Sequence, residues 1–334
     1  MDGSEEALVA VHDGALLDLD GVLYVGQAAV PGAAEAVAKA RAAGTRVAFV
    51  TNNASRTPQT VAAHLSDLGI AAEPHDVVTS AQAAASLVAA AVPPGSAVLV
   101  VGGEGLDAAV VERDLRPVQT MAGSPVAVVQ GFGPDVGWRL LAEGAYAVRA
   151  GLPWVASNLD VTIPTAAGIA PGNGTLVEVI AMATGRRPTV AGKPETPLYA
   201  EAVQRLGSER PVVVGDRLDT DIEGANRAGL PSLLVLTGVT TAADLVRAQP
   251  PLRPTYVSRD LPSGLLQPHP PVTRTPSGGW ACGGWECAVG DNGIELIGAG
   301  DAVDGLRALC AAVWSQETPP MQEHVDGVLR RLGL

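Results

Sequence analysis

Four short polar segments of this chain hold residue types that could bind a phosphate group together with a divalent cation. The first is Asp18-Leu19-Asp20-Gly21, in which two carboxylates two positions apart point the same way from an extended backbone. Gly21 would let main-chain N–H groups approach an anion. The same residues also suit an ordinary turn, so this segment by itself does not establish chemistry.

The second and third segments supply hydrogen-bond donors and one positive charge. Thr51-Asn52-Asn53 offers a hydroxyl and two amides that can donate to phosphate oxygens, although a helix-capping loop has the same composition. Lys193 precedes Pro194, where helical sequence begins, and its compact ammonium could offset charge on a carboxylate and a phosphate. All 22 basic residues except Lys39 and Lys193 are arginines, and a surface lysine that escaped this bias is the alternative reading of Lys193.

The fourth segment, residues 215–222, brings three acids to the end of an apolar run. Asp216, Asp219 and Asp221 lie within six positions, and clustered carboxylates repel one another unless a cation is present. An oxygen-rich Mg²⁺ site would resolve that repulsion. Asp219 and Asp221 could instead cap the helix that follows, an interpretation that suits Asp219 best.

Apolar runs place each segment at the end of a predicted buried strand. Helical sequence separates the runs, and this alternation predicts an α/β fold with a parallel, doubly wound sheet. Ligands of such sheets bind beyond the carboxyl ends of the strands, so the four segments are expected to meet at one edge. The predicted strands are residues 14–18, 46–50, 98–101, 126–130, 154–157, 189–191, 211–214 and, as the final strand, 233–236; predicted helices include residues 31–43, 57–68 and 175–183.

The composition changes after residue 250. Prolines and glycines crowd residues 250–284, which predicts a linker. Beyond it, residues 280–289 and 294–297 are strand-like, Asp291-Asn292-Gly293 suits a hairpin turn, and residues 302–313 are helical. A small α+β C-terminal extension is therefore expected.

Composition and charge exclude several classes of protein. Hydrophobic residues make up 47% of the 334 residues, enough for a sizeable core, whereas aromatic residues make up only 3%, too few for nucleic-acid stacking platforms. A net charge of −13 repels a phosphate polymer, so no nucleic-acid partner is expected. The acidic start lacks a secretion signal, no apolar run could span a bilayer, and Cys282, Cys287 and Cys310 lack disulfide or zinc spacing. These features predict a cytoplasmic protein without a membrane span.

In this order, the four segments resemble the motifs of the haloacid dehalogenase (HAD) superfamily over about residues 12–262. The long separation of Thr51 from Lys193 leaves room for an inserted cap domain, as in the branch of NagD-like, 4-nitrophenyl, pyridoxal and glycerol phosphate phosphatases. The resemblance implies a HAD core of residues 1–80 and 189–262 and a C2-type α/β cap of residues 81–188. Residues 263–334 would form the linker and a C-terminal segment faintly similar to part of a GNAT acetyltransferase.

The resemblance also implies roles for the acids. Asp18 matches the nucleophile that forms an aspartyl-phosphate intermediate, and Asp20 matches the general acid/base. Mg²⁺ would be held by the carboxylates of Asp18 and Asp216 and by the main-chain carbonyl of Asp20. Asp221 would orient metal-bound waters from outside the ligand set.

The remaining site residues match phosphate-binding positions of the family. Thr51 and Asn52 would hold the phosphoryl oxygens with Asn53 close by, and Lys193 would stabilise the charge as it redistributes. The loop of residues 157–164 resembles one that faces the active site in this branch.

The resemblance to bacterial glycerol 3-phosphate phosphatases, which are implicated in recycling glycerol phosphates from lipid breakdown, implies glycerol 3-phosphate as the small-molecule phosphate ester. Ile163 stands where vitamin-phosphate members carry a histidine, which argues against pyridoxal phosphate. The alternatives are another sugar, nucleotide or aryl phosphate, a non-enzymatic phosphometabolite sensor, and an acetyl-coenzyme A-binding or acyltransferase role for the C-terminal segment. That segment is expected to cover the core or to help form a homodimer.

Overall fold

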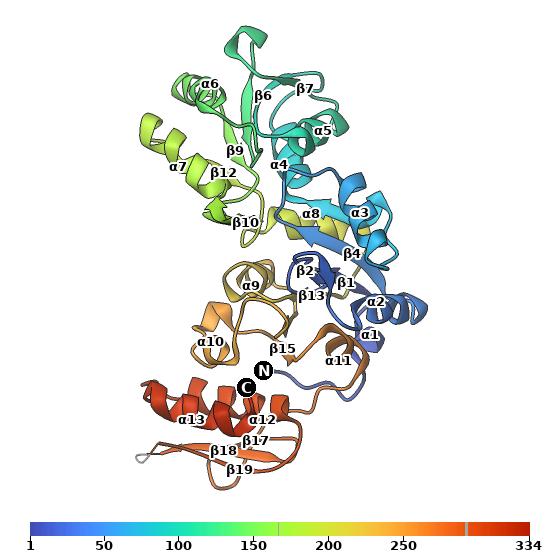
Figure 1. The fold of residues 1–334 in the computed structure, drawn as a ribbon, viewed down its shortest axis with the longest axis vertical. Helices are drawn as coiled ribbons and strands as arrows, with labels where there is room; N and C mark the ends of the chain where they lie inside the picture. The colour runs from blue at the N-terminus through green and yellow to red at the C-terminus, as the bar shows by residue number, and fades with distance from the viewer. Residues whose placement is uncertain (166, 291–292) are drawn as a thin grey trace. The chain divides into compact units, whose positions relative to one another are not determined.

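The computed structural model describes residues 1–165, 167–290 and 293–334 (Figure 1). The chain forms two compact units, of which the first comprises residues 1–48 and 206–334 and the second comprises residues 49–205. The core, cap and tail boundaries given above follow the motifs rather than these units, and they stay predictions. Asp291 and Asn292 of the predicted hairpin turn lie outside the described residues.

A six-stranded sheet carries the strands that lead to the polar segments. It consists of β1 (Gly14–Leu17), β4 (Arg46–Thr51), β5 (Val77–Thr79), β13 (Pro211–Gly215), β14 (Ser232–Val235) and β15 (Tyr256–Ser258), in the order β15-β14-β13-β1-β4-β5. β1 pairs with β13, β13 with β14, β14 with β15, and β4 with β5, each in parallel. Every residue of β1, β13 and β14 is buried, as expected for a parallel sheet covered on both faces. The predicted α/β class is confirmed.

Two predictions about the end of this sheet are wrong. Residues 233–236 do not form the final strand, because β15 follows and pairs with β14. Residues 250–284 are not simply a linker either, since they contain β15, the 3₁₀ turn η4 (Pro250–Leu252) and helix α11 (Leu261–Leu266). Proline lies in the first turn of α11, where a missing N–H costs nothing, so proline content was a poor guide to structure here.

Helices and short turns complete the sheet part of the first unit. The helices are α1 (Leu8–Val11), α2 (Ala33–Ala42), α9 (Glu223–Ala228) and α10 (Ala242–Val246). The hairpin of β2 (Tyr24–Val25) and β3 (Ala28–Ala29) precedes α2, and the π-helical turn η3 (Leu218–Ile222) precedes α9. Helix α2 packs against α11, and α1 also contacts α11. These contacts fix the chain on either side of Asp18.

The C-terminal segment is packed into the first unit. Antiparallel strands β16 (Thr273–Arg274), β17 (Trp280–Cys282), β18 (Trp285–Gly290) and β19 (Gly293–Gly298) lie beneath helices α12 (Ala302–Trp314) and α13 (Gln322–Leu332) in Figure 1. One apolar core joins buried Leu306 and Leu309 of α12 to Leu234 of β14 and Val257 of β15. The three cysteines are buried and free. The segment therefore shares its core with the six-stranded sheet.

The second unit contains its own parallel sheet. Strands β6 (Ala97–Val101), β7 (Arg116–Val118), β8 (Ala127–Gln130), β9 (Trp154–Ala156) and β12 (Thr189–Val190) have the order β12-β9-β8-β6-β7. The two-residue strand that leads to Lys193 thus pairs with β9 of this sheet, so the expectation that all four polar segments follow strands of one sheet is wrong for Lys193. The other elements are α3 (Pro58–Asp67), η1 (Pro74–Asp76), α4 (Ser80–Ala89), α5 (Glu104–Glu112), η2 (Met121–Gly123), α6 (Trp138–Arg149), β10 (Thr162–Thr165), β11 (Gly168–Pro171), α7 (Asn173–Thr184) and α8 (Pro197–Leu206).

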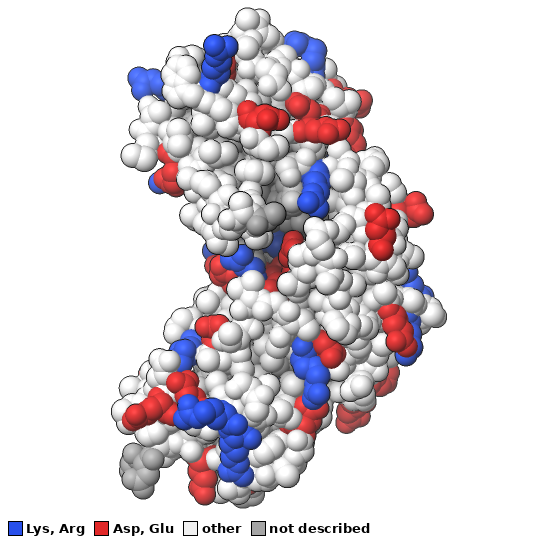
Figure 2. Space-filling view, viewed as in Figure 1, with Lys and Arg blue, Asp and Glu red and all other residues white. Residues whose placement is uncertain are grey.

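Charges are mixed on the face of the molecule drawn in Figure 2. Lysine and arginine side chains lie singly or in small groups among acidic ones there. Within the described part of the chain, each helix is too short or too polar to cross a bilayer.

Candidate active site

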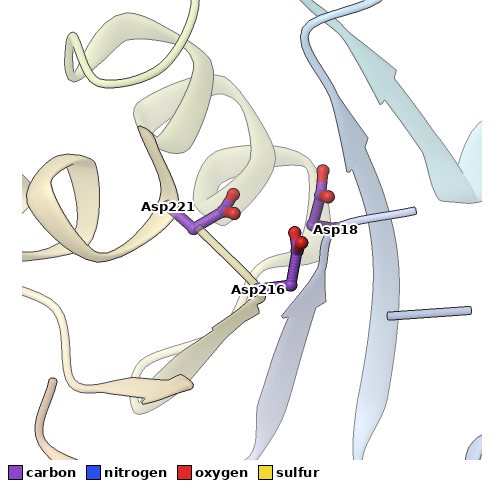
Figure 3. Close-up of side chains that lie close together, drawn as sticks. All are labelled: Asp18, Asp216 and Asp221. Carbon is purple, nitrogen blue, oxygen red and sulfur yellow. The ribbon is translucent and has the colours of Figure 1, made fainter. Parts of the chain in front are cut away.

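The acids predicted to bind a metal ion come together at one edge of the six-stranded sheet. Asp18 follows β1 and Asp216 follows its parallel neighbour β13, and the N–H of Asp18 donates to the carbonyl of Val214 at 2.8 Å. Asp221 comes from the turn η3 that follows Asp216. One carboxylate oxygen from each of the three acids lies within 4.8 Å of the other two (Figure 3).

The loop after β14 holds Asp216 in place. Asp216 is only 2% exposed, and its Oδ2 accepts a hydrogen bond from the main-chain N–H of Val239 at 2.6 Å. A Cβ added at Gly238 would overlap this same oxygen, and so would one added at Gly21, which has φ +79°. Glycine at both positions therefore lets two main-chain segments close around the carboxylate.

The turn η3 aims Asp221 at the same place. The carboxylate, in a residue that is 1% exposed, accepts a hydrogen bond from the N–H of Arg217 at 3.2 Å. A Cβ on Gly215 would overlap the Asp221 side chain, so this glycine is needed where strand meets turn. Such π-helical turns are frequent at functional sites. The structure thus places Asp221 as close to the group as Asp18 and Asp216.

Asp219 lies outside this group. Its carboxylate bonds to the guanidinium of Arg217 at 2.8 Å, and that hydrogen bond lowers the pKa of Asp219. The N-cap residues of η3 and α9 are Arg217 and Ile222, and neither forms a side-chain cap. Asp219 and Asp221 therefore do not occupy the cap positions that the alternative interpretation gave them.

The three carboxylates fit a hard divalent cation. They offer oxygen atoms at short mutual distances, and two of the three residues are almost fully buried. Mg²⁺ prefers such oxygen ligands, and a cation would relieve the repulsion among them. Asp20 is exposed, and its main chain bridges to Tyr24. The predicted carbonyl-ligand and acid/base roles of Asp20 stay predictions.

Thr51-Asn52-Asn53 is a structured loop that does not cap a helix. Thr51 is 6% exposed, and its Oγ1 accepts a hydrogen bond from the N–H of Asn53 at 3.1 Å. Asn53 Oδ1 accepts from the main-chain N–H of Ser55 at 2.9 Å. Helix α3 begins later and is capped by Thr57, whose side chain accepts from the N–H of Thr60.

Within the second unit, Asn52 joins this loop to Lys193. Asn52 Oδ1 accepts the N–H of Lys193 at 2.8 Å, and Asn52 Nδ2 donates to the Lys193 carbonyl at 3.1 Å. Lys193 is 4% exposed and is followed by a cis peptide bond to Pro194. A surface lysine is therefore excluded, and the predicted second and third segments are in contact.

The sequence analysis singled out the loop 157–164 but assigned no role to Asn158 or Asp160 within it. Asn52 also approaches Asp160, whose carboxylate oxygens lie 3.3 and 3.4 Å from Asn52 Nδ2. The main-chain carbonyl of Asn52 accepts a hydrogen bond from Asn158 Nδ2 at 2.7 Å. Both residues lie in the loop 157–164, and their position after β9, at a strand end, was the available signal. Gly238 and Val239 gave no comparable signal.

Family models match three parts of the chain. Residues 15–116 match the haloacid dehalogenase-like hydrolase family, and residues 190–263 match the HAD-hydrolase-like family. Residues 282–334 match a GCN5-related N-acetyltransferase like domain. The matches cover both predicted halves of the core and the C-terminal segment.

Known proteins resemble most or nearly all of the chain. The D-glycerol 3-phosphate phosphatase of Mycobacterium tuberculosis is 47% identical over 324 residues, which are 95% of this chain and 90% of that protein. An acid sugar phosphatase of Staphylococcus aureus is 35% identical over 254 residues, 75% of this chain and 96% of its own length. The crystal structure of a glycerol phosphate phosphatase from M. tuberculosis in complex with magnesium has a TM-score of 0.88 at 45% identity, covering 98% of this chain and 99% of that one.

Proposed function

We propose, from the premise that this chain belongs to the haloacid dehalogenase-like hydrolases, that it hydrolyses D-glycerol 3-phosphate to glycerol and phosphate with Mg²⁺ as cofactor. One observation carries the proposal: Asp18, Asp216 and Asp221 present carboxylate oxygens within 4.8 Å of one another at the carboxyl ends of parallel strands. The relatives named above support a phosphatase reaction on a small phosphate ester.

Two aspartates carry the proposed reaction. An oxygen of Asp18 attacks phosphorus while the ester P–O bond breaks, and Asp20 gives its proton to the leaving alkoxide. Water then attacks the acyl phosphate, Asp20 takes a proton from that water, and the bond from Asp18 to phosphorus breaks. Mg²⁺ held by Asp18, Asp216 and the main chain of Asp20 would offset the charge of two anions that must approach each other.

The phosphate group is held by neutral donors and one ammonium. We assign this role to Thr51, the main chain of Asn52, Asn53 and Lys193. The burial of Thr51 and Lys193, at 6% and 4% exposure, supports it, because water competes weakly for buried donors. The bond from Asn52 to the main chain of Lys193 supports a joint role.

The choice of glycerol 3-phosphate as substrate is based on the relatives. Glycerol phosphate is the substrate in the names of the M. tuberculosis protein and its magnesium-bound structure. Ile163 in place of a histidine argues against pyridoxal phosphate. We place the reaction in the cytoplasm and keep a homodimer as part of the proposal.

A panel of phosphate esters tests the proposal. The purified chain is assayed for released phosphate with Mg²⁺ and with EDTA, using glycerol 3-phosphate, sugar phosphates, a nucleotide and 4-nitrophenyl phosphate. We expect Mg²⁺-dependent release with glycerol 3-phosphate preferred, and loss of turnover in a folded Asp18→Asn variant. Normal hydrolysis by that variant would refute the mechanism, whereas equal rates on all esters would refute only the substrate.

The match of residues 282–334 to an acetyltransferase-like domain favours one second candidate, a coenzyme A-binding role. The buried apolar residues of the segment form one core with residues of β14 and β15, which supports a structural role instead. Calorimetric titration with acetyl-coenzyme A decides between them: saturable heat supports the second candidate, and its absence supports the structural role.

A further inference from the structure

We infer that the side chain of Asn52 is a positioning residue: its amide fixes the main chain of Lys193 and the carboxylate of Asp160 in one arrangement. This inference rests on the proposed phosphatase function and deepens it, because it separates the groups that touch phosphate, which include the main chain of Asn52, from a side chain that acts through them. The three residues belong to the same compact unit, residues 49–205.

The first argument is that both polar atoms of the Asn52 side chain are used. Oδ1 accepts the N–H of Lys193 at 2.8 Å, and Nδ2 donates to the carbonyl of the same residue at 3.1 Å, across 141 positions of sequence. An amide is both donor and acceptor, so it can satisfy both main-chain groups of one residue. Alanine could satisfy neither group, and aspartate could satisfy only the N–H.

The second argument is that Lys193 is brought close for this contact. A Cβ on the preceding residue, Gly192, would lie 2.5 Å from Asn52 Oδ1 and would overlap the carbonyl of Ser157. Glycine therefore allows the chain to approach the asparagine. Lysine carries its charge on a flexible four-carbon stem, so a fixed main chain limits where the ammonium can be.

The third argument is that Asn52 is itself held from the other side. Its main-chain carbonyl accepts hydrogen bonds from Ser80 Oγ at 2.5 Å and Asn158 Nδ2 at 2.7 Å. Asn158 is 4% exposed, its Oδ1 accepts the N–H of Asp160 at 3.2 Å, and its carbonyl accepts Nδ2 of the buried Asn173 at 2.8 Å. The asparagine thus connects the Lys193 segment to a braced loop.

Asp160 completes the arrangement. Its two oxygens lie 3.4 and 3.3 Å from Asn52 Nδ2, the same nitrogen that donates to Lys193. A carboxylate at position 52 would face the carboxylate of Asp160, and like charges at this distance repel. If position 52 carries aspartate, an asparagine at position 160 would again provide an amide that donates a hydrogen bond from one side chain to the other.

An exchange of the two side chains tests the inference. The variants are Asn52→Asp, Asp160→Asn and the double variant, with Asp135→Asn as a control that removes an exposed acid of the same unit. For each variant we would measure kcat, KM, the inhibition constant of inorganic phosphate, the Mg²⁺ concentration for half-maximal activity, and Tm. Calorimetric binding of inorganic phosphate adds a readout that needs no turnover.

We expect Asn52→Asp to lower kcat/KM by about 10- to 100-fold, the range usual for residues that orient a site from outside. Phosphate binding should weaken, while the Mg²⁺ midpoint stays within about twofold of wild type because the acid cluster is untouched. Adding Asp160→Asn should recover about tenfold of the loss.

Two results would overturn the inference. If the double variant is no better than Asn52→Asp, the carboxylate at position 52 repels phosphate directly and the side chain of Asn52 is itself a phosphate ligand. If Asn52→Asp binds phosphate as wild type does, the side chain positions nothing. Should Asn52→Asp fail to fold, Asn52→Ala replaces it, and unchanged phosphate binding in that variant refutes the inference equally. Failure of the proposed function would appear instead in wild type, as absent turnover.

Discussion

The main-chain N–H of Val239 donates a hydrogen bond to Oδ2 of Asp216 at 2.6 Å, so the loop after β14 holds the carboxylate of an acid that lies at the end of β13. This contact orients one of the three clustered carboxylates without using a side chain. It depends on Gly238, which lies next to Val239 and against the same oxygen. The geometry of the acid cluster therefore relies on residues that carry no chemistry of their own.

A methyl group at Gly238 should damage metal binding. In Gly238→Ala the new Cβ would overlap Asp216 Oδ2, so the carboxylate or the loop must shift. We expect the Mg²⁺ affinity to fall by about 10- to 100-fold, as is usual when groups that orient metal ligands are changed. The measurement is the Mg²⁺ dependence of phosphatase activity.

Gly290→Ala is the matched control for that variant. Gly290 lies in the same unit, and no atom of the described residues other than its chain neighbours lies within 4 Å of the Cβ that this substitution adds, so the Mg²⁺ dependence of this variant should equal that of wild type. Equal Mg²⁺ affinities in the Gly238 and Gly290 variants would contradict the role given to the loop.

Mg²⁺ should stabilise the folded chain. Three carboxylates held within 4.8 Å repel one another, and a ligand that binds only the folded state raises the free energy of unfolding. At a free Mg²⁺ concentration of a hundred times the dissociation constant, the free energy of unfolding should rise by about 2.7 kcal/mol. Urea unfolding with and without Mg²⁺ measures it, and Asp216→Asn should lose most of the gain. A gain of the same size in that variant would place the ion elsewhere.

The C-terminal segment should unfold together with the catalytic sheet. Leu309 of α12 is fully buried in the core shared with β14 and β15, so Leu309→Ala should lower the free energy of unfolding by about 2–5 kcal/mol. Leu334, which is 43% exposed, provides the control Leu334→Ala with little change. Fluorescence of the segment's tryptophans and enzyme activity should be lost at the same urea concentration; activity that outlasts the fluorescence change would show an independent tail.

The sequence predicted those parts of the site that depend on regular secondary structure. Asp18 and Asp216 end neighbouring parallel strands, and apolar runs followed by acids are visible in the sequence. Parallel pairing alone then brings the two carboxylates to one sheet edge. The contact of Asn52 with Lys193 does not follow from this rule, because Asn52 comes after β4 of the six-stranded sheet and Lys193 comes after β12 of the five-stranded sheet.

Contacts made by loops that fold back could not be predicted. Asp160 approaches Asn52 across 108 positions, and Val239 approaches Asp216 across 23, and no periodicity encodes either approach. The strand β15 was missed for a different reason. It has three residues among prolines, which is too short for an alternating or apolar pattern to emerge.

A buried histidine offers a last test of the packing of the C-terminal segment. His269 is 1% exposed, and its Nε2 lies 2.8 Å from the Gly264 carbonyl while Nδ1 lies 3.1 Å from a guanidinium nitrogen of Arg307. A carbonyl only accepts and a guanidinium only donates, so the neutral ring with its proton on Nε2 satisfies both. Arg307 also bonds Asp304 at 2.5 Å, and the ring of Tyr256 lies 5.2 Å from that of His269.

Acid should therefore destabilise this region through His269. Burial, the largest cause, lowers the pKa of His269 from its ordinary 6.5, so the folded state binds the proton more weakly than the unfolded state. The contribution to the free energy of unfolding is complete above pH 6.5 and is lost as pH falls below it. Urea unfolding between pH 8 and pH 5 should show this decline, and His269→Gln should flatten it in part, because burial also lowers the pKa of His12. His75→Gln, at a side chain that is 80% exposed, should leave the slope as in wild type; an equally steep decline in the His269 variant would assign the acid sensitivity to other groups.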